Sequence, residues 1–320
     1  MRINVKMTMR VIPYLLCCML VFCATGQIKR PMIIGRTSGS ITFENGSEMR
    51  VFGFTGRLSE PINLPGTTIE AREGDSLEID FWNVSQGNPH DIRIQGIQLQ
   101  KRNEPHEIYT DDNIHHMEHG YYSFIASHAG TYIYYCPVNY PLDVQAGMFG
   151  ILVVRPKLEN KIYYKQVSQE LLWCGFEMDT TWHTDSILDA EREEIPQMAK
   201  KLDYRPQYFF INDKRNGQQT NPAVLNAKVG EKVLLRLANM GLMEHLVTFP
   251  KEMKLNVLTK NAASIPAHDE VNALILKPLD TYEILVSSNA VLNSFVSYAF
   301  KNEIQNTAIQ IEKIPVLITK

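Results

Sequence analysis

The chain has 320 residues, enough for two domains with ordinary hydrophobic cores. Its formal net charge is −3 and 21% of its residues are charged, so it lacks the basic surplus of proteins that bind nucleic acid. Glycine and proline are scattered without a low-complexity stretch, and nothing in the composition predicts disorder.

Residues 1–26 are predicted to be a secretory signal peptide, because a basic start leads into a short apolar run with small residues before Gln27. The basic residues are Arg2, Lys6 and Arg10, and the apolar run is Val11 to Ala24. That run is too short for a membrane span, and no later stretch is apolar enough for one. We therefore expect an exported protein, periplasmic or secreted. The alternative is a lipoprotein anchored at Cys23, although Phe22 is a poor residue to precede a lipidated cysteine.

Export changes the interpretation of the cysteines. Three of the five lie within or beside the signal, which leaves Cys136 and Cys174. In an oxidising compartment, one interpretation is a disulfide between these two. The other is that Cys136 is a metal-binding thiolate, and the residues around it favour this second interpretation.

The mature chain is predicted to be all-β, because short alternating stretches recur with turn residues between them. In residues 76–83 the alternation places Leu77, Ile79 and Phe81 on one face, after a turn at Gly74. A later strand places Tyr132, Tyr134 and Cys136 on one face. Four aromatic residues are expected in the core: Trp82, Phe124, Tyr132 and Tyr134. The polar residues 184–201 are expected to form a long loop or a short helix.

The first strand pattern recurs later in the chain. Residues 70–83 match residues 226–239, with alanine, glycine and the final asparagine at the same places. A histidine follows each copy at nearly the same distance, His90 and His245. We infer an internal duplication with one barrel per copy. The boundary is expected near Pro156, giving a first domain of residues 27–157 and a second of 158–320.

Three residues have the chemistry of a mononuclear copper site. Such sites combine imidazole, thiolate and a weak thioether ligand in a rigid frame. His90 lies in an early loop, and Cys136 and Met148 surround the last turn of the first domain. This combination predicts one copper ion in the first barrel.

At these residues the sequence resembles the multicopper oxidase and copper nitrite reductase superfamily. The resemblance is most specific in three segments: Pro65 to Asp75, Gly130 to Cys136 and Val144 to Gly150. It implies two tandem cupredoxin-like Greek-key β-barrels. It also implies that His90, Cys136 and Met148 are ligands of a type 1 copper.

Several family ligands are replaced in this chain. Asp143 stands where the family has the second type 1 histidine, and carboxylate is a harder ligand than imidazole. Gln95 and Tyr135 stand where nitrite reductases have first-barrel ligands of their type 2 copper, and Arg93 stands where they have a catalytic aspartate. The chain has nine histidines but no His-x-His pair, so a trinuclear oxygen-reducing centre is not expected. The second domain is expected to hold no copper, because only His245 and His268 lie in its body.

A second histidine cluster has two interpretations. His115-His116-Met117-Glu118-His119 could hold copper or zinc near the surface, or it could be a polar loop with incidental histidines. His106, His128 and His183 are isolated and are expected to be structural or solvated.

Three functions remain open. The first is copper binding or electron transfer through a modified type 1 ion held by His90, Cys136, Asp143 and Met148. The second is a multicopper-oxidase-like oxidoreductase with reorganised ligands, and the third is a metal-free scaffold with a vestigial site. The sequence does not identify a redox partner, and by resemblance a dimer and a trimer are both open.

Overall fold

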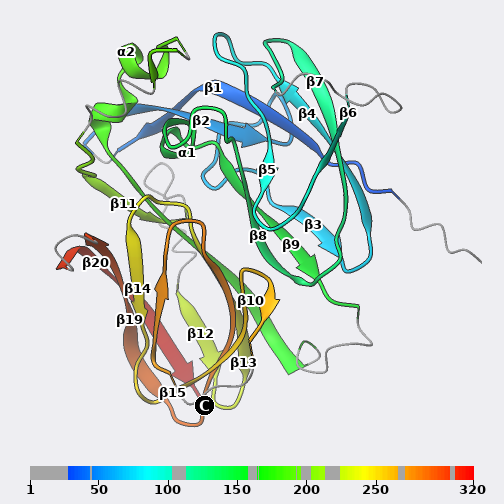
Figure 1. Cartoon of the computed structure of the whole chain (residues 1–320). Helices are drawn as coiled ribbons and strands as arrows, with labels where there is room; N and C mark the ends of the chain where they lie inside the picture. The colour runs from blue at the N-terminus through cyan, green and yellow to red at the C-terminus, as the bar shows by residue number, and fades with distance from the viewer. Residues whose placement is uncertain are drawn as a thin grey trace, which may run out of the picture.

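The computed structural model describes residues 28–43, 45–102, 113–157, 164, 166–191, 193–195, 203–212, 224–265, 271–302 and 307–320. The predicted signal peptide, His106 and His268 lie outside these residues. The described strands form four sheets, arranged as two bodies, one above the other in Figure 1. The all-β prediction is confirmed.

The first body consists of two sheets that enclose one core. The five-stranded sheet has the order β2 (Glu48–Thr55), β1 (Met32–Thr42), β4 (Ser76–Asn83), β7 (Glu118–Ile125), β6 (Gln100–Arg102). The four-stranded sheet has the order β3 (Ile69–Arg72), β9 (Phe149–Arg155), β8 (Gly130–Tyr135), β5 (Arg93–Ile94). Leu77, Ile79 and Phe81 of β4 lie in this core, as the alternation predicts. The short helix α1 (Leu142–Ala146) connects β8 to β9.

The second body has the same construction. One sheet has the order β11 (Tyr208–Ile211), β10 (Val167–Met178), β13 (Lys232–Asn239), β18 (Thr281–Ser288), β15 (Met253–Lys260), β16 (Ala263–Ser264). The other has the order β12 (Leu225–Lys228), β20 (Thr307–Thr319), β19 (Leu292–Asn302), β14 (Glu244–Thr248), β17 (Ala273–Leu276). Their facing side chains form a separate core around Trp173, Leu235 and Phe300.

The two repeated segments fold in the same way. Gly74 and Gly230 occupy the third position of equivalent turns with φ of +86° and +83°, a conformation that favours glycine because it has no Cβ. In each turn an acidic side chain accepts a backbone N–H: Arg72 N–H donates to Asp75 Oδ2 (2.7 Å), and Lys228 N–H donates to Glu231 Oε2 (2.9 Å). The strand that follows runs parallel to the first long strand of its barrel in both copies. This local identity supports the inferred duplication.

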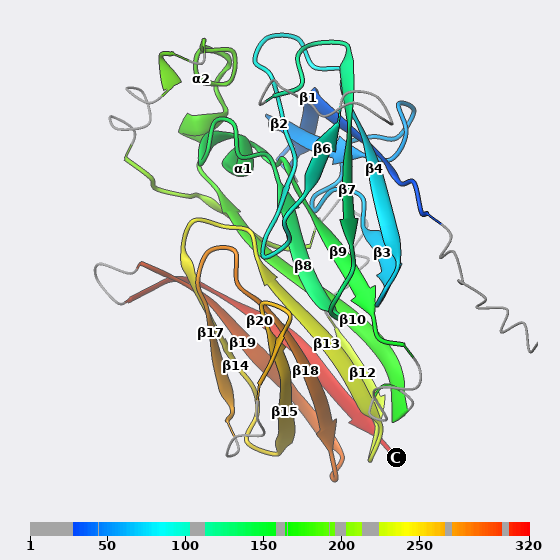
Figure 2. The same cartoon turned by 45° about the vertical axis from the view of Figure 1, so that its right-hand side comes forward.

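The two barrels share a third core. β8 is buried on both faces: Tyr132, Tyr134 and Cys136 face the first barrel's own core, whereas Ile133 and Tyr135 face the second barrel. The shared core contains Phe149 and Ile151 of β9 together with Phe176, Met178 and Met240 of the second barrel. In both views β8 and β9 lie beside β10, where the barrels meet (Figure 2).

A segment that follows β10 returns to the first barrel. It contains a 3₁₀ helix, η2 (Thr180–His183), and α2 (Asp185–Leu188), which Figure 1 shows above β1 and β2. Its apolar side chains join the first barrel's core: Trp182, Ile187, Leu188, Ala190 and Ile195. The prediction of a loop or short helix is right for its described part, and the segment covers one end of the first barrel. Among the described residues, no helix has the length and apolar character needed to cross a membrane.

One of the four aromatic core assignments is wrong. Trp82 lies on the outer face of β4 and is half-buried, because its neighbours Phe81 and Asn83 face inward. Its ring stacks on the imidazole of His119, with centroids 4.1 Å apart and planes 17° from parallel.

Candidate metal centre

Three side chains of the first barrel meet at one buried point. Cys136 Sγ lies 3.1 Å from Asp143 Oδ2 and 3.6 Å from His90 Nδ1. The remaining distance, between His90 Nδ1 and Asp143 Oδ2, is 3.3 Å. His90 and Asp143 are each 1% exposed, and Cys136 is not exposed at all.

Different elements position the three residues. His90 lies in the loop after β4, where its backbone forms two hydrogen bonds with Ile114, of 3.0 and 2.9 Å. Cys136 directly follows β8, so the pairing of β8 with β9 fixes its height in the barrel. Asp143 lies in the first turn of α1, and its N–H donates to Asn139 O at 3.3 Å.

Met148, the fourth predicted ligand, is buried in the same core as Cys136. Its backbone connects the other two loop residues. Its N–H donates to Asp143 O (2.8 Å), and its carbonyl accepts from Cys136 N–H (3.0 Å). Met148 is therefore tied to Cys136 and Asp143 by backbone hydrogen bonds and is buried in the same core as Cys136.

In the metal-free protein, the site stabilises the neutral thiol of Cys136. Burial raises the pKa of Cys136 well above its ordinary value, and the negative charge of Asp143 raises it further. The protonated Cys136 Sγ then donates to Asp143 Oδ2. His90 Nε2 is buried without a hydrogen-bond partner, which is unusual for an imidazole in a core.

These residues do not form a nucleophilic triad, although cysteine, histidine and aspartate are all present. A triad uses one ring nitrogen to take the nucleophile's proton and the other to hold the carboxylate. Here Cys136 and Asp143 both face Nδ1 of His90. A buried thiol with a raised pKa is also a poor nucleophile.

The triangle of donor atoms does fit a metal ion. A point equidistant from His90 Nδ1, Cys136 Sγ and Asp143 Oδ2 lies about 1.9 Å from each, close to metal–nitrogen and metal–sulfur bond lengths of about 2.0–2.3 Å. Imidazole with thiolate is the donor pair preferred by copper and zinc. Within the described residues, this is the one group of at least three His, Cys, Asp or Glu side chains whose donor atoms lie within 4.8 Å of one another.

Comparisons with known proteins agree with this architecture. A multicopper oxidase family profile matches residues 38–159. The copper-containing nitrite reductase of Neisseria meningitidis is 26% identical over 209 residues, covering 63% of this chain and 47% of that protein. Laccase-3 of Oryza sativa is 26% identical over 235 residues, covering 70% and 39%. The chain thus spans less than half the length of these curated relatives.

Solved structures show the same fold. The blue copper oxidase of Nitrosomonas europaea superimposes with a TM-score of 0.67 at 18% identity, covering 91% of this chain and 86% of that one. The copper nitrite reductase of the same organism gives 0.65 at 17% identity, covering 91% and 95%. The first barrel thus matches the multicopper oxidase family, and the chain as a whole has the fold of multicopper oxidases and copper nitrite reductases. The predicted pair of cupredoxin-like barrels is confirmed.

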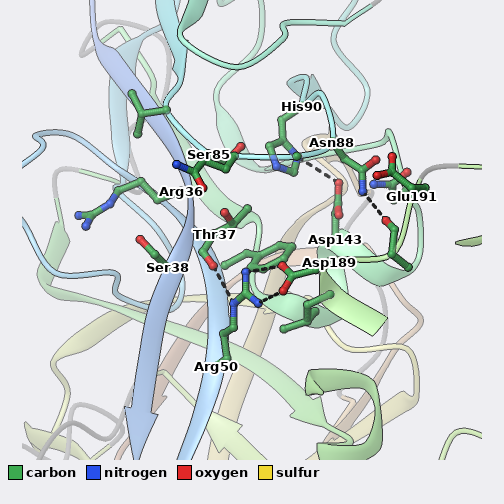
Figure 3. Close-up of a pocket in the computed structure, with 17 residues that line it drawn as sticks. Arg36, Thr37, Ser38, Arg50, Ser85, Asn88, His90, Asp143, Asp189 and Glu191 are labelled. Carbon is green, nitrogen blue, oxygen red and sulfur yellow. Dashed lines mark hydrogen bonds and ion pairs between the residues drawn. The ribbon is translucent and has the colours of Figure 1, made fainter. Parts of the chain in front are cut away.

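A polar cavity of about 620 Å³ reaches the site. Figure 3 shows His90 and Asp143 facing each other, with the pair of Asp189 and Arg50 below them. Arg50 Nη2 pairs with Asp189 Oδ1 at 2.7 Å and Arg50 Nε donates to Thr37 O at 3.0 Å, so this arginine is fully engaged. Sequence reasoning missed Arg50 and Asp189, because residues 139 apart carry no shared pattern.

The histidine cluster of residues 115–119 does not converge on a common point. His116 Nδ1 lies 2.5 Å from Ser85 O, and His119 Nδ1 lies 3.1 Å from Asp80 Oδ1. Met117 has a φ of +62° and an exposed side chain. These separate contacts favour the interpretation of a structural loop.

The remaining described histidines and cysteines have local environments of their own. His245, the repeat equivalent of His90, is buried between Glu177 Oε2 (3.0 Å) and Tyr298 Oη (2.9 Å). His183 Nδ1 donates to Arg50 O at 2.6 Å, and burial lowers the pKa of His183. His128 is exposed. Cys136 and Cys174 are both free and lie in different cores, so the disulfide interpretation is wrong.

Proposed function

We propose that this protein is an exported, copper-binding member of the multicopper oxidase and copper nitrite reductase superfamily that transfers electrons through one modified type 1 copper ion. His90, Cys136 and Asp143 would hold the ion, with Met148 as a weak further ligand. The observation that carries the proposal is the buried triangle of imidazole, thiol and carboxylate, whose size suits a metal ion. The proposal of export rests on the predicted signal peptide.

Bound copper would supply one-electron redox chemistry at this point. The protein's own contribution is a rigid, buried frame, which reduces the rearrangement needed when the charge of the ion changes. Asp143 would place a negative charge beside the metal and so favour the oxidised state. The polar cavity at His90 and Asp143 supports the approach of a redox partner from that side.

The oxidase alternative is less well supported. Oxygen or nitrite reduction in this superfamily would need further copper ions. In the part of the chain that the structure describes, no second group of three close metal-binding side chains accompanies the first. The metal-free scaffold is the stronger competitor, because the Cys136 thiol is already hydrogen-bonded to Asp143 without a metal.

Copper loading distinguishes the copper-binding function from the metal-free scaffold. The purified protein is incubated with Cu(II), desalted, and measured for bound copper and for a thiolate-to-copper absorption band. We expect one retained equivalent with a strong visible band. The Cys136→Ser variant should lose the band, whereas Cys174→Ser, which alters the other buried free cysteine, should keep it. A wild-type protein that retains no copper and develops no band would show that the site is vestigial.

A further inference from the structure

The helix that carries Asp143 depends on contacts outside itself. α1 has five residues, all buried, and no side-chain hydrogen bond caps its N-terminus. A helix this short is unstable in water, because nucleation costs more than a single turn of hydrogen bonds returns. The position of Asp143 is therefore set by whatever holds α1 in place.

Gln145 connects α1 to the second barrel. Residues two apart on an α-helix point about 200° from each other, so Asp143 faces the first barrel while Gln145 faces away from it. Gln145 Nε2 donates to Glu177 O (2.8 Å) and to Tyr204 Oη (3.2 Å). Gln145 Oε1 accepts from Asp179 N–H (2.7 Å). All three partners belong to the chain after β9, and α1 lies beside β10 in Figures 1 and 2.

These partners are themselves rigidly held. The Glu177 carboxylate accepts from the N–H groups of Leu242 (2.6 Å) and Met243 (2.9 Å), and Tyr204 Oη donates to its Oε1 (3.0 Å). The Asp179 carboxylate accepts from Arg205 N–H at 2.6 Å. Gln145 therefore binds to a rigidly held point at the end of β10.

The bonding pattern requires an amide. The same side chain must donate to a carbonyl and accept from an N–H, which glutamine does with one orientation of its end group. Glutamate cannot donate to Glu177 O when ionised. Leucine would leave Asp179 N–H unpaired in a buried place and would leave Glu177 O with only the Tyr204 hydroxyl, 3.2 Å away, which is costly.

We propose that Gln145 is a positioning residue for the metal centre: it fastens α1 to the second barrel and so holds Asp143 Oδ2 beside Cys136 Sγ and His90 Nδ1. The spectroscopic part of this inference rests on the proposed function. The second barrel would then serve as a clamp on the copper site of the first. Gln145 would touch neither metal nor substrate and would act through Asp143.

The test uses Gln145→Leu in the full chain with two measurements. In the metal-free protein, alkylation of Cys136 is followed peptide by peptide by mass spectrometry, with Cys174 as internal reference. We expect Cys136 to react about tenfold faster or more, because the loop that covers it opens more often. In the copper-loaded protein, we expect the thiolate-to-copper band and the electron paramagnetic resonance parameters to shift.

Thr131→Val is the matched control. Thr131 Oγ1 donates to Glu283 Oε1 (3.0 Å), a contact between the barrels that does not involve α1. The Thr131→Val variant should have a lower thermal stability, but the same Cys136 reactivity and the same copper spectrum as the wild type. If Gln145→Leu matches the wild type in both measurements, or if Thr131→Val shifts both equally, the positioning role is overturned. If wild type binds no copper, the proposed function fails while the alkylation measurement still tests the clamp.

Discussion

Asp143 is the residue that most distinguishes this site from one with two imidazole ligands. Its carboxylate is 1% exposed, lies 3.3 Å from His90 Nδ1, and accepts a hydrogen bond from Cys136 Sγ. A buried carboxylate is tolerated only where it is paired or hydrogen-bonded. Its negative charge therefore lies directly at the candidate metal position and should stabilise a bound cation.

Asp143→His should raise the reduction potential of the copper-loaded protein and strengthen its thiolate-to-copper band. Imidazole is neutral near pH 7, so the oxidised ion loses the stabilisation that the carboxylate supplies. A tenfold change in relative affinity for the two oxidation states corresponds to about 59 mV for one electron, and we expect at least this shift. Redox titration measures it.

Asp143→Asn separates charge from ligand type, since the amide has the same shape without the charge. The Asp143→Asn variant should raise the reduction potential without strengthening the thiolate-to-copper band.

An Asp143→His protein with the wild-type absorption band and reduction potential would mean that Asp143 is not a ligand.

Ligand chemistry predicted Cys136 and Met148, and the family resemblance added Asp143, which lies between them in one strand-to-strand connection. Residues of one short connection keep a fixed spacing, so they can be recognised from the sequence alone. Gln145 and Arg50 gave no such signal, since Glu177 lies 32 residues from Gln145 and Asp189 lies 139 residues from Arg50. Trp82 was assigned to the core from its aromatic character, although its place in the alternation of β4 puts it on the outer face.

At the scale of elements, alternation and turn chemistry were enough to predict β4 and β13. For β8 they predicted the strand and the face that carries Tyr132 and Tyr134, but not that the opposite face is buried too, against a second core. A strand buried on both sides shows no period of two. The segment of η2 and α2 was equally hard to place, because its polar residues face solvent while a few apolar side chains cover a barrel end.

Gly147→Ala should destabilise the protein more than Gly230→Ala does. Both glycines have positive φ, +117° and +83°, so both variants incur backbone strain of about 1 kcal/mol. A Cβ at Gly230 would meet nothing within 4 Å, whereas one at Gly147 would lie 2.5 Å from Phe52 O. Gly147 also ends α1.

Urea unfolding of both variants measures the difference. We expect a loss of about 1 kcal/mol for Gly230→Ala and at least twice that for Gly147→Ala. Equal losses would mean that the chain around Phe52 moves aside and that the end of α1 is not tightly fixed.

At the scale of the whole molecule, ion pairs join the barrels beside the shared core. Arg155, at the end of β9, pairs with Glu170 of β10 at 2.5 Å. Glu170 also accepts from Arg236 Nη2 (3.2 Å), and Arg236 pairs with the fully buried Glu283. Burial alone would raise the pKa of Glu170, but the hydrogen bond from Arg155 and the charges of Arg236 and Arg155 outweigh it and lower the pKa.

Glu170→Gln should reduce the acid sensitivity of stability. A carboxylate with a lowered pKa contributes its full stability above its ordinary value of 4.5 and loses it as the pH falls through the lowered value. At neutral pH the variant should lose under about 1 kcal/mol, because water screens a partly exposed pair. Below pH 4.5 its unfolding free energy should approach that of wild type. If the unfolding free energies of wild type and Glu170→Gln differed by the same amount at neutral pH and below pH 4.5, Glu170 would be excluded as the titrating group.

The duplication predicted the number of barrels and their order in the chain. It could not predict which faces meet, since contacts between barrels arise after duplication and leave no repeat. The boundary near Pro156 stays a prediction. Five apolar residues beyond it pack in the first barrel's core: Trp182, Ile187, Leu188, Ala190 and Ile195.

The shared core has a consequence for how the molecule melts. Ile133, Tyr135 and Phe149 of one barrel pack in the same buried cluster as Phe176, Met178 and Met240 of the other. Losing either barrel would expose this surface on its partner. We therefore expect heating to give a single cooperative transition rather than two, with a calorimetric enthalpy close to the van 't Hoff enthalpy of the whole chain.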